Sequence, residues 1–192
     1  MMGSLLDNLT AKGRRKRAVQ ESPTAELAAR MLRAPSALIQ LSEDDARVIV
    51  SYMEPRRFDA DARVMTAGDT ENTDYMLLVL EGAVTVESVN VSRKLPITVT
   101  VLGPGSMLGE MSLLDGSPRS VTCTAGDDLL CAQLTREGLQ ELIQDDSILG
   151  IKLLIAIGMR MAERLRDNTD KLWRYARLTQ AMQQEIDRLM PT

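Results

Sequence analysis

The residues best suited to chemistry lie in one stretch, Pro104 to Val121, which reads PGSMLGEMSLLDGSPRSV. Gly109 allows the backbone to approach a ligand closely, because glycine has no side chain and adopts almost any φ. It opens a short apolar run whose first N–H groups favour an anion. Arg119, further along, can hold a phosphate through two parallel hydrogen bonds. With the carboxylate of Glu110 beside them, these residues predict a seat for a phosphate-bearing ligand.

The composition favours a globular protein that binds rather than catalyses. The chain has 192 residues, of which 44% are hydrophobic, so it can bury a full core. We expect no membrane span and no signal peptide, because no apolar run is long enough for either. The two cysteines then indicate the reducing cytoplasm. Histidine, the commonest general base and metal ligand, is absent, so we expect no enzyme, no metal and no cofactor.

Residues 1–22 are predicted to form a basic and flexible N-terminal arm. Five of the six residues from Lys12 to Arg17 are cationic, although the net charge of the whole chain is −4. Such an arm can bind nucleic acid or acidic lipid, or it can be a solvated terminus. Because the remainder of the chain is acidic, we favour the solvated terminus.

The elements around the phosphate stretch are expected to be helices first and strands afterwards. Apolar spacing predicts a helix over 24–39, and Ser42 caps a second helix that Pro55 stops. Over 56–134, short β-rich runs separated by glycine turns predict an antiparallel sandwich or barrel. We therefore expect residues 23–146 to form an α+β domain.

Two cysteines flank a predicted turn at 126–128. A hairpin centred on that turn would place Cys123 opposite Cys131. They are then either a redox-sensitive pair or two small residues of the core, and we favour the core.

Residues 147–192 are predicted to form one long helix that dimerises as a parallel coiled coil. A narrow stripe with alternating spacings of four and three is typical of that assembly and would be unstable alone. Asn168 in this stripe either sets the register of the dimer or faces a ligand, and the two roles are compatible. Trp173 either stacks on a base or packs in an interface, and we favour packing. The stripe contains Leu154, Gly158, Met161, Leu165, Asn168, Leu172, Tyr175, Thr179, Met182, Ile186 and Leu189.

Together, the β segment, the stretch GEMSLLDGSPRSV and the following helices resemble the cyclic nucleotide-binding domain family. The resemblance runs from about Ser42 to the middle of the long helix. Its most specific part is the order Gly109-Glu110, an apolar run, then Pro118-Arg119-Ser120. It implies a jelly-roll-like antiparallel β-roll whose long C-terminal helix dimerises and covers the ligand.

The resemblance also implies roles for individual residues. Glu110 would accept a hydrogen bond from the ribose 2′-OH, and Arg119 would neutralise the phosphate. The adenine-reading positions of the family fall on Asn168 and Thr169, with Thr169 directed to the ligand of the partner chain. The remaining contacts would come from Leu108, Gly109, the N–H groups of Met111 and Ser112, and the hydroxyl of Ser120.

The function implied is that of a cytoplasmic homodimeric receptor for cAMP or cGMP, with cAMP favoured. In the family's transcription factors a helix-turn-helix domain follows the long helix, whereas this sequence ends at Thr192. We therefore expect a stand-alone sensor that signals to an unidentified protein and binds neither nucleic acid nor membrane. The alternatives are a coiled-coil assembly protein with a vestigial pocket, a cyclic dinucleotide receptor, and a nucleic-acid binder acting through residues 12–17.

Overall fold

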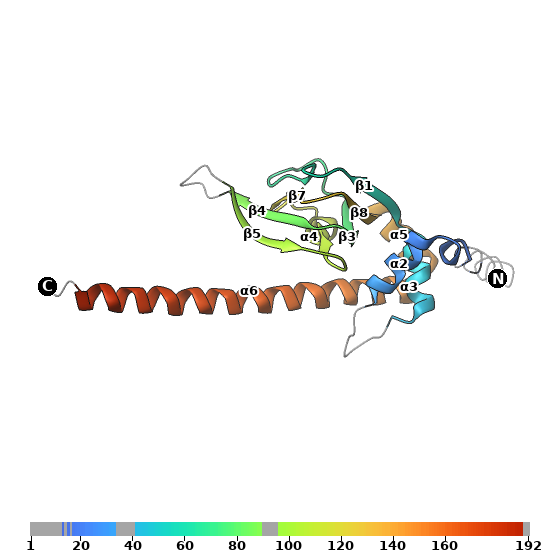
Figure 1. The fold of residues 1–192 in the computed structure, drawn as a ribbon. Helices are drawn as coiled ribbons and strands as arrows, with labels where there is room; N and C mark the ends of the chain where they lie inside the picture. The colour runs from blue at the N-terminus through green and yellow to red at the C-terminus, as the bar shows by residue number, and fades with distance from the viewer. Residues whose placement is uncertain (1–12, 14, 16, 34–40, 90–95, 190–192) are drawn as a thin grey trace. The chain divides into compact units, whose positions relative to one another are not determined.

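The computed structural model describes residues 13, 15, 17–33, 41–89 and 96–189 (Figure 1). The chain divides into two compact units, residues 1–153 and 154–192. Of the predicted basic cluster, Lys12, Arg14 and Lys16 lie outside the described residues, and the division into 1–22, 23–146 and 147–192 stays a prediction. No helix in the described ranges is long and apolar enough to cross a membrane.

The first unit is built on two four-stranded sheets in which every pairing is antiparallel. Side chains from both sheets form one buried core, with Leu77 and Val79 from one sheet meeting Val84 and Val86 from the other. The predicted α+β fold with an antiparallel β-roll is therefore confirmed. The first sheet has the order β1 (Glu54–Phe58), β8 (Leu129–Thr135), β3 (Tyr75–Glu81), β6 (Met107–Leu108), and the second β2 (Arg63–Met65), β7 (Thr122–Ala125), β4 (Val84–Val89), β5 (Pro96–Leu102).

Helices α2 (Pro23–Leu32), α3 (Glu43–Val50) and α5 (Arg136–Asp145) lie together at one end of the sheets (Figure 1). The helix predicted after Ser42 ends at Val50 and not at Pro55. Its last residues close in a tight turn, because the N–H groups of Tyr52 and Met53 donate three residues back. Pro55 lies instead in β1, an edge strand, where a missing N–H group is tolerated. The helix predicted over 24–39 ends at Leu32, and 34–40 lie outside the described residues.

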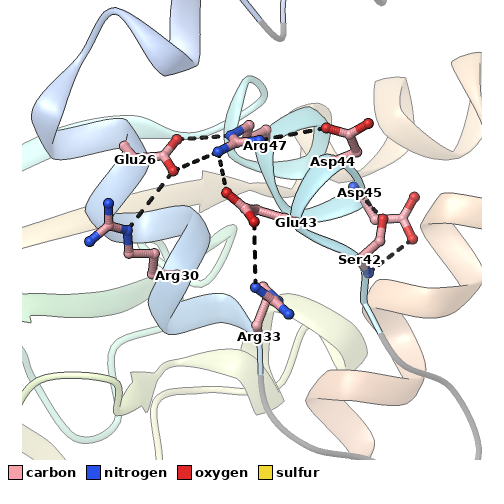
Figure 2. Close-up of polar contacts among 8 residues, drawn as sticks. All are labelled: Glu26, Arg30, Arg33, Ser42, Glu43, Asp44, Asp45 and Arg47. Carbon is pink, nitrogen blue, oxygen red and sulfur yellow. Dashed lines mark hydrogen bonds and ion pairs between the residues drawn. The ribbon is translucent and has the colours of Figure 1, made fainter.

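A cluster of charged side chains joins α2 to α3 (Figure 2). Arg47 donates to both carboxylate oxygens of Glu26 at 2.9 Å, and it also contacts Glu43 on its own helix. The capping box of α3 pairs Ser42 with Asp45, whose carboxylate accepts from Lys152 in the first turns of α6 at 2.6 Å. Partly buried ion pairs therefore join α2 to α3 and α3 to the first turns of α6.

The hairpin predicted for the two cysteines is wrong. Cys123 in β7 pairs with Val86, whereas Cys131 in β8 pairs with Val79 in the other sheet. The turn after β7 therefore connects the two sheets, because β7 pairs with strands of one sheet and β8 with strands of the other. Both cysteines are buried thiols in that core, as the favoured interpretation predicted.

Helix α6 runs without interruption over Ser147–Leu189, so the predicted long C-terminal helix is confirmed. At about 1.5 Å per residue it is roughly 65 Å long. Large apolar side chains of its second half are exposed. They are Leu165, Leu172, Trp173, Tyr175, Leu178, Met182, Ile186 and Leu189.

Candidate ligand-binding site

The predicted phosphate stretch forms a six-residue helix, α4 (Glu110–Asp115), between β6 and β7. Glycines lie at both ends of this helix. Gly109 at the N-cap has a φ of 75°, and Gly116 at the C-cap a φ of 71°. This left-handed backbone suits glycine and is strained for other residues. The chain thus turns sharply at both ends of α4.

Arg119 is held by three separate parts of the first unit. Its Nη1 donates to the carbonyl of Gly109 at 2.9 Å, its Nη2 to that of Tyr75 at 2.9 Å, and its Nε to that of Asn72 at 2.8 Å. The guanidinium carbon also lies 4.5 Å from the centroid of the Tyr75 ring, which is the geometry of a cation–π contact. The side chain is only 4% exposed. Its position is therefore fixed by the fold itself.

The hydrogen bonds of Arg119 do not neutralise its positive charge. All three acceptors are neutral carbonyls, and the charge acts on the Asp69 carboxylate, whose pKa it helps to lower. A guanidinium has five N–H groups, so two remain after these three bonds. A buried cation is costly unless an anion accompanies it. The site is therefore suited to a single negative charge.

The loop between β2 and β3 contacts Arg119 through hydrogen bonds. Its Asp69 carboxylate accepts from the N–H groups of Glu71 and Asn72 and from the Asn72 side chain, at 2.9, 3.2 and 2.9 Å. These hydrogen bonds, with that of the Asn72 side chain first, lower the pKa of Asp69. The main chain adds two bonds, from Arg119 N–H to the Asp69 carbonyl and from Gly68 N–H to the Arg119 carbonyl. Asp69 thereby presents the Asn72 carbonyl to the guanidinium.

The predicted residues in and beside α4 divide into buried and exposed ones. Glu110 and Ser112 are each 3% exposed, and so is Leu108 in β6. Met111 is 47% exposed. Ser120 is exposed as well. The structure therefore brings the segment from Leu108 to Ser112 together with Arg119, through the Gly109 carbonyl, and leaves the part of Ser120 a prediction.

Asn168 and Thr169 belong to the second unit. Both are exposed on α6, and the Thr169 hydroxyl donates to the Leu165 carbonyl at 2.9 Å, one turn earlier in the same helix. Their part in reading a base stays a prediction.

Sequence reasoning missed the acceptors around Arg119 and a second arginine, Arg136. Backbone carbonyls carry no signature in a sequence, so the roles of Asn72 and Tyr75 were hidden. Arg136 did leave a signal. It is the first residue of α5, where the positive end of the helix dipole disfavours a cation, and its side chain turns away to α4.

The site offers binding chemistry. Within the ranges that the structure describes, no group of three or more histidine, cysteine or acidic residues could hold a metal ion. The features that remain are a buried cation, a buried carboxylate at Glu110 and the first N–H groups of a helix. This set suits a ligand that carries one negative charge and a hydroxyl group.

Comparisons with known proteins agree with this geometry. The model of the cyclic nucleotide-binding domain family matches residues 55–146. The cyclic AMP receptor protein of Thermus thermophilus is 28% identical over 123 residues, which is 64% of this chain and 56% of that receptor. The chain thus spans about half the length of this relative.

Solved structures extend the likeness to the fold. A cyclic nucleotide-binding domain from Methylobacillus flagellatus superposes with a TM-score of 0.72 and 31% identity, covering 78% of this chain and 83% of that one. The c-di-GMP responsive regulator CLP of Xanthomonas campestris gives a TM-score of 0.58 and 27% identity over 66% of this chain and 61% of that one. With this fold, the segment from Gly109 to Arg119 and these relatives, the chain belongs to the cyclic nucleotide-binding domain family.

Proposed function

We propose that the protein is a receptor for a cyclic mononucleotide, with cAMP as the favoured ligand, and that it catalyses no reaction. The observation that carries the proposal is the buried charge of Arg119, which is 4% exposed and bonded only to neutral carbonyls. The cyclic phosphate of a mononucleotide has one negative charge. Its burial beside Arg119 would give this buried cation an anionic acceptor in a charge-assisted pair.

The sugar and the base would be read by other residues. The carboxylate of Glu110, buried in the first turn of α4, would accept from the ribose 2′-OH, the one sugar hydroxyl that a 3′,5′-cyclic phosphate leaves free. Asn168 and Thr169 would read the base. Thr169 would contact the base of the ligand that the partner chain binds. We expect Asn168→Ala to reduce the preference for cAMP over cGMP. An equal loss of affinity for both nucleotides would show that Asn168 does not read the base.

The protein would act as a homodimer through α6. The alternating four and three spacing of its exposed apolar residues supports this assembly. Ligand binding would change the positions of the dimer helices. This movement would alter a surface that a partner protein recognises. The two buried thiols are compatible with the cytoplasmic location that we expect.

Titration calorimetry with cAMP, cGMP and c-di-GMP tests the proposal. We expect cAMP to bind, and Arg119→Gln to weaken it at least about 30-fold, because a buried charge pair loses one member. Arg57→Gln is the matched control, since Arg57 is an exposed arginine in β1. No heat with either mononucleotide, or equal affinities for the two variants, would overturn the proposal.

A cyclic dinucleotide is the second candidate, because the c-di-GMP responsive regulator is among the relatives. It carries two phosphates, whereas the site offers one buried arginine whose hydrogen-bond acceptors are neutral carbonyls. Tight binding of c-di-GMP with no response to cAMP would replace the first candidate by the second.

A further inference from the structure

Arg15, in the basic stretch near the N-terminus, is bound to the end of α5. Its Nη1 donates to the Asp145 carboxylate at 3.0 Å, and its guanidinium carbon lies 4.3 Å from the centroid of the Tyr52 ring, a cation–π contact. The Tyr52 hydroxyl donates to the same carboxylate oxygen at 2.7 Å. Val19, among the helical residues 17–20, is only 4% exposed. The described part of the N-terminal region is therefore bound to the rest of the first unit.

Asp145 is the last member of an acidic row on α5. Glu137, Glu141 and Asp145 follow one another at intervals of four residues, so they share one face of the helix, and all three are exposed. Like charges at this spacing destabilise a helix, and cations beside them offset the repulsion. Five of the six residues from Lys12 to Arg17 are cationic. The charge of this stretch is therefore complementary to the face of α5 that Arg15 contacts.

An exposed apolar patch lies at the joint between α5 and α6, on either side of Asp145 in the chain. We call Ile143, Ile148 and Ile151 the isoleucine patch; their exposed fractions are 37%, 69% and 54%. A Cβ added to Gly150 would lie 2.6 Å from Cγ1 of Ile143, so α5 and the first turns of α6 touch there. Ile148 and Ile151 are three residues apart and share one face of α6. Exposed apolar side chains gathered in this way mark a surface that binds another segment.

Residues 1–12 have the composition and the length to cover this patch. They lie outside the described residues, and five of their first nine are large and apolar, namely Met1, Met2, Leu5, Leu6 and Leu9. The isoleucine patch is within six residues of Asp145, so even an extended backbone would place it no more than about 20 Å from that residue. Twelve residues would span about 18 Å as a helix and about 40 Å when extended. The ion pair of Arg15 with Asp145 therefore places the segment within reach of the patch.

We propose that residues 1–12 cover the isoleucine patch of their own chain, and that the contact of Arg15 with the acidic row of α5 anchors them there. Burial of apolar side chains drives the contact, and the opposite charges give it specificity. A partner protein that uses the patch must first displace residues 1–12. The contact needs no ligand, so it goes beyond the proposed function and can be tested independently of it.

Amide hydrogen exchange of the full chain without ligand tests the contact. One variant that combines Leu5→Ser, Leu6→Ser and Leu9→Ser should exchange faster than the natural sequence over residues 143–151, because the patch loses its cover. The matched control combines Asn8→Ser with Thr10→Ser. It changes polar neighbours in the same segment and should leave the exchange of 143–151 unchanged. Equal exchange in the natural sequence and in the leucine variant would overturn the proposal.

A disulfide tests where the segment binds. Leu9→Cys combined with Ile148→Cys should form a disulfide with oxidised glutathione at least about tenfold faster than Leu9→Cys combined with Val101→Cys, because a bound segment raises the local concentration of the two thiols. Val101 is the matched control, since it is an apolar residue of β5 with a similar exposed fraction, 61%. The two natural cysteines are buried. We expect the disulfide to form within one chain, which electrophoresis distinguishes from a bond between chains.

The acidic row is tested in the same disulfide assay. Glu137→Gln combined with Glu141→Gln should slow the bond between positions 9 and 148 several-fold, because the basic stretch loses its complementary charges. Glu81→Gln removes a charge from an exposed residue at the end of β3 and should leave the rate unchanged. Equal rates in these two variants would remove the acidic row from the proposal.

The remaining outcomes identify other occupants. A disulfide that joins two chains, or protection of 143–151 that depends on protein concentration, would assign the patch to a second copy and overturn the proposal. If the leucine variant does not fold, the disulfide rates decide: the expected difference would support the contact, and equal rates for positions 148 and 101 would overturn it.

Discussion

The guanidinium of Arg119 occupies the space that a side chain on residue 109 would need. A Cβ built on Gly109 would lie 3.1 Å from Cζ of Arg119, and nearer still to its Nη1. The Gly109 carbonyl accepts from that same Nη1 at 2.9 Å. Gly109 is thus required twice, for its positive φ and for the room it leaves to the arginine.

We predict that Gly109→Ala lowers the affinity for cAMP to the level of Arg119→Gln, because the new methyl group displaces the guanidinium. The backbone strain should also cost about 1–2 kcal/mol of stability. Gly116→Ala is the control, since Gly116 has a similar φ of 71° but only Arg136 Nη2 near it, at 3.9 Å. That variant should lose stability alone. Calorimetry and thermal unfolding measure both effects, and equal affinity losses in the two variants would contradict the steric argument.

Glu110→Gln should reveal the sugar contact through a comparison of ligands. The amide keeps the shape of the side chain and removes the charge, so the hydrogen bond to the ribose weakens by roughly 1–2 kcal/mol. We expect the natural sequence to prefer cAMP over 2′-deoxy-cAMP by tenfold or more, on the order of a charge-assisted bond. In Glu110→Gln the preference should shrink. A preference of the same size in both proteins would mean that Glu110 does not read the 2′-OH.

The sequence predicted the β-roll and the long C-terminal helix, because both depend on local signals. The uninterrupted apolar run in β3, the glycines around α4 and the apolar spacing in α6 each favour their own element. Contacts between distant segments were harder to predict from the sequence. The partners of Arg119 are carbonyls of Asn72 and Tyr75, which any residue types would offer.

The cysteines show the same limit. Two strands separated by a short turn usually form a hairpin, and this rule placed Cys123 opposite Cys131. In the fold each strand instead completes a different sheet, because the core lies between them. Spacing alone cannot distinguish a hairpin from a crossing between sheets.

We predict that the thiol of Cys131 does not react in the folded protein. The residue is fully buried, and burial raises the pKa of its thiol to about 12. The thiolate is the reactive form, so labelling by a maleimide near neutral pH should require unfolding. The same protein in denaturant is the control. Rapid labelling of the folded chain, or a Cys123–Cys131 disulfide after mild oxidation, would restore the redox interpretation.

Glu26→Gln should reduce stability at neutral pH and have less effect in acid. The hydrogen bond from Arg47 holds the pKa of Glu26 below 4.5. A carboxylate with a lowered pKa stabilises the fold above its unfolded pKa, and this contribution is lost as the pH falls through the folded value. Thermal unfolding of Glu26→Gln and of the natural sequence should therefore differ at neutral pH, and the difference should disappear as the pH falls through the lowered pKa of Glu26.

Arg30→Gln serves as the control for that pair. Arg30 also approaches Glu26, at 3.9 Å, but its side chain is 73% exposed, and exposed pairs contribute little. We expect Arg30→Gln to have the same unfolding temperature as the natural sequence at every pH. If Arg30→Gln lost as much stability as Glu26→Gln, the stabilising partner of Glu26 would be Arg30 and not Arg47.

The two neighbours Leu172 and Trp173 test the proposed dimer, because they are equally exposed on α6, at 67% and 66%. Leu172 lies on the stripe with alternating four and three spacing, whereas Trp173 lies one residue, or about 100°, around the helix. We expect Leu172→Glu to convert the dimer to monomer in sedimentation experiments, because a buried seam cannot accept like charges from both chains. Trp173→Glu adds the same charge outside the stripe and should remain dimeric. If only Trp173→Glu dissociated the dimer, the interface would lie on the face of the helix that carries Trp173. If Leu172→Glu had no effect, the stripe of α6 would not form the interface.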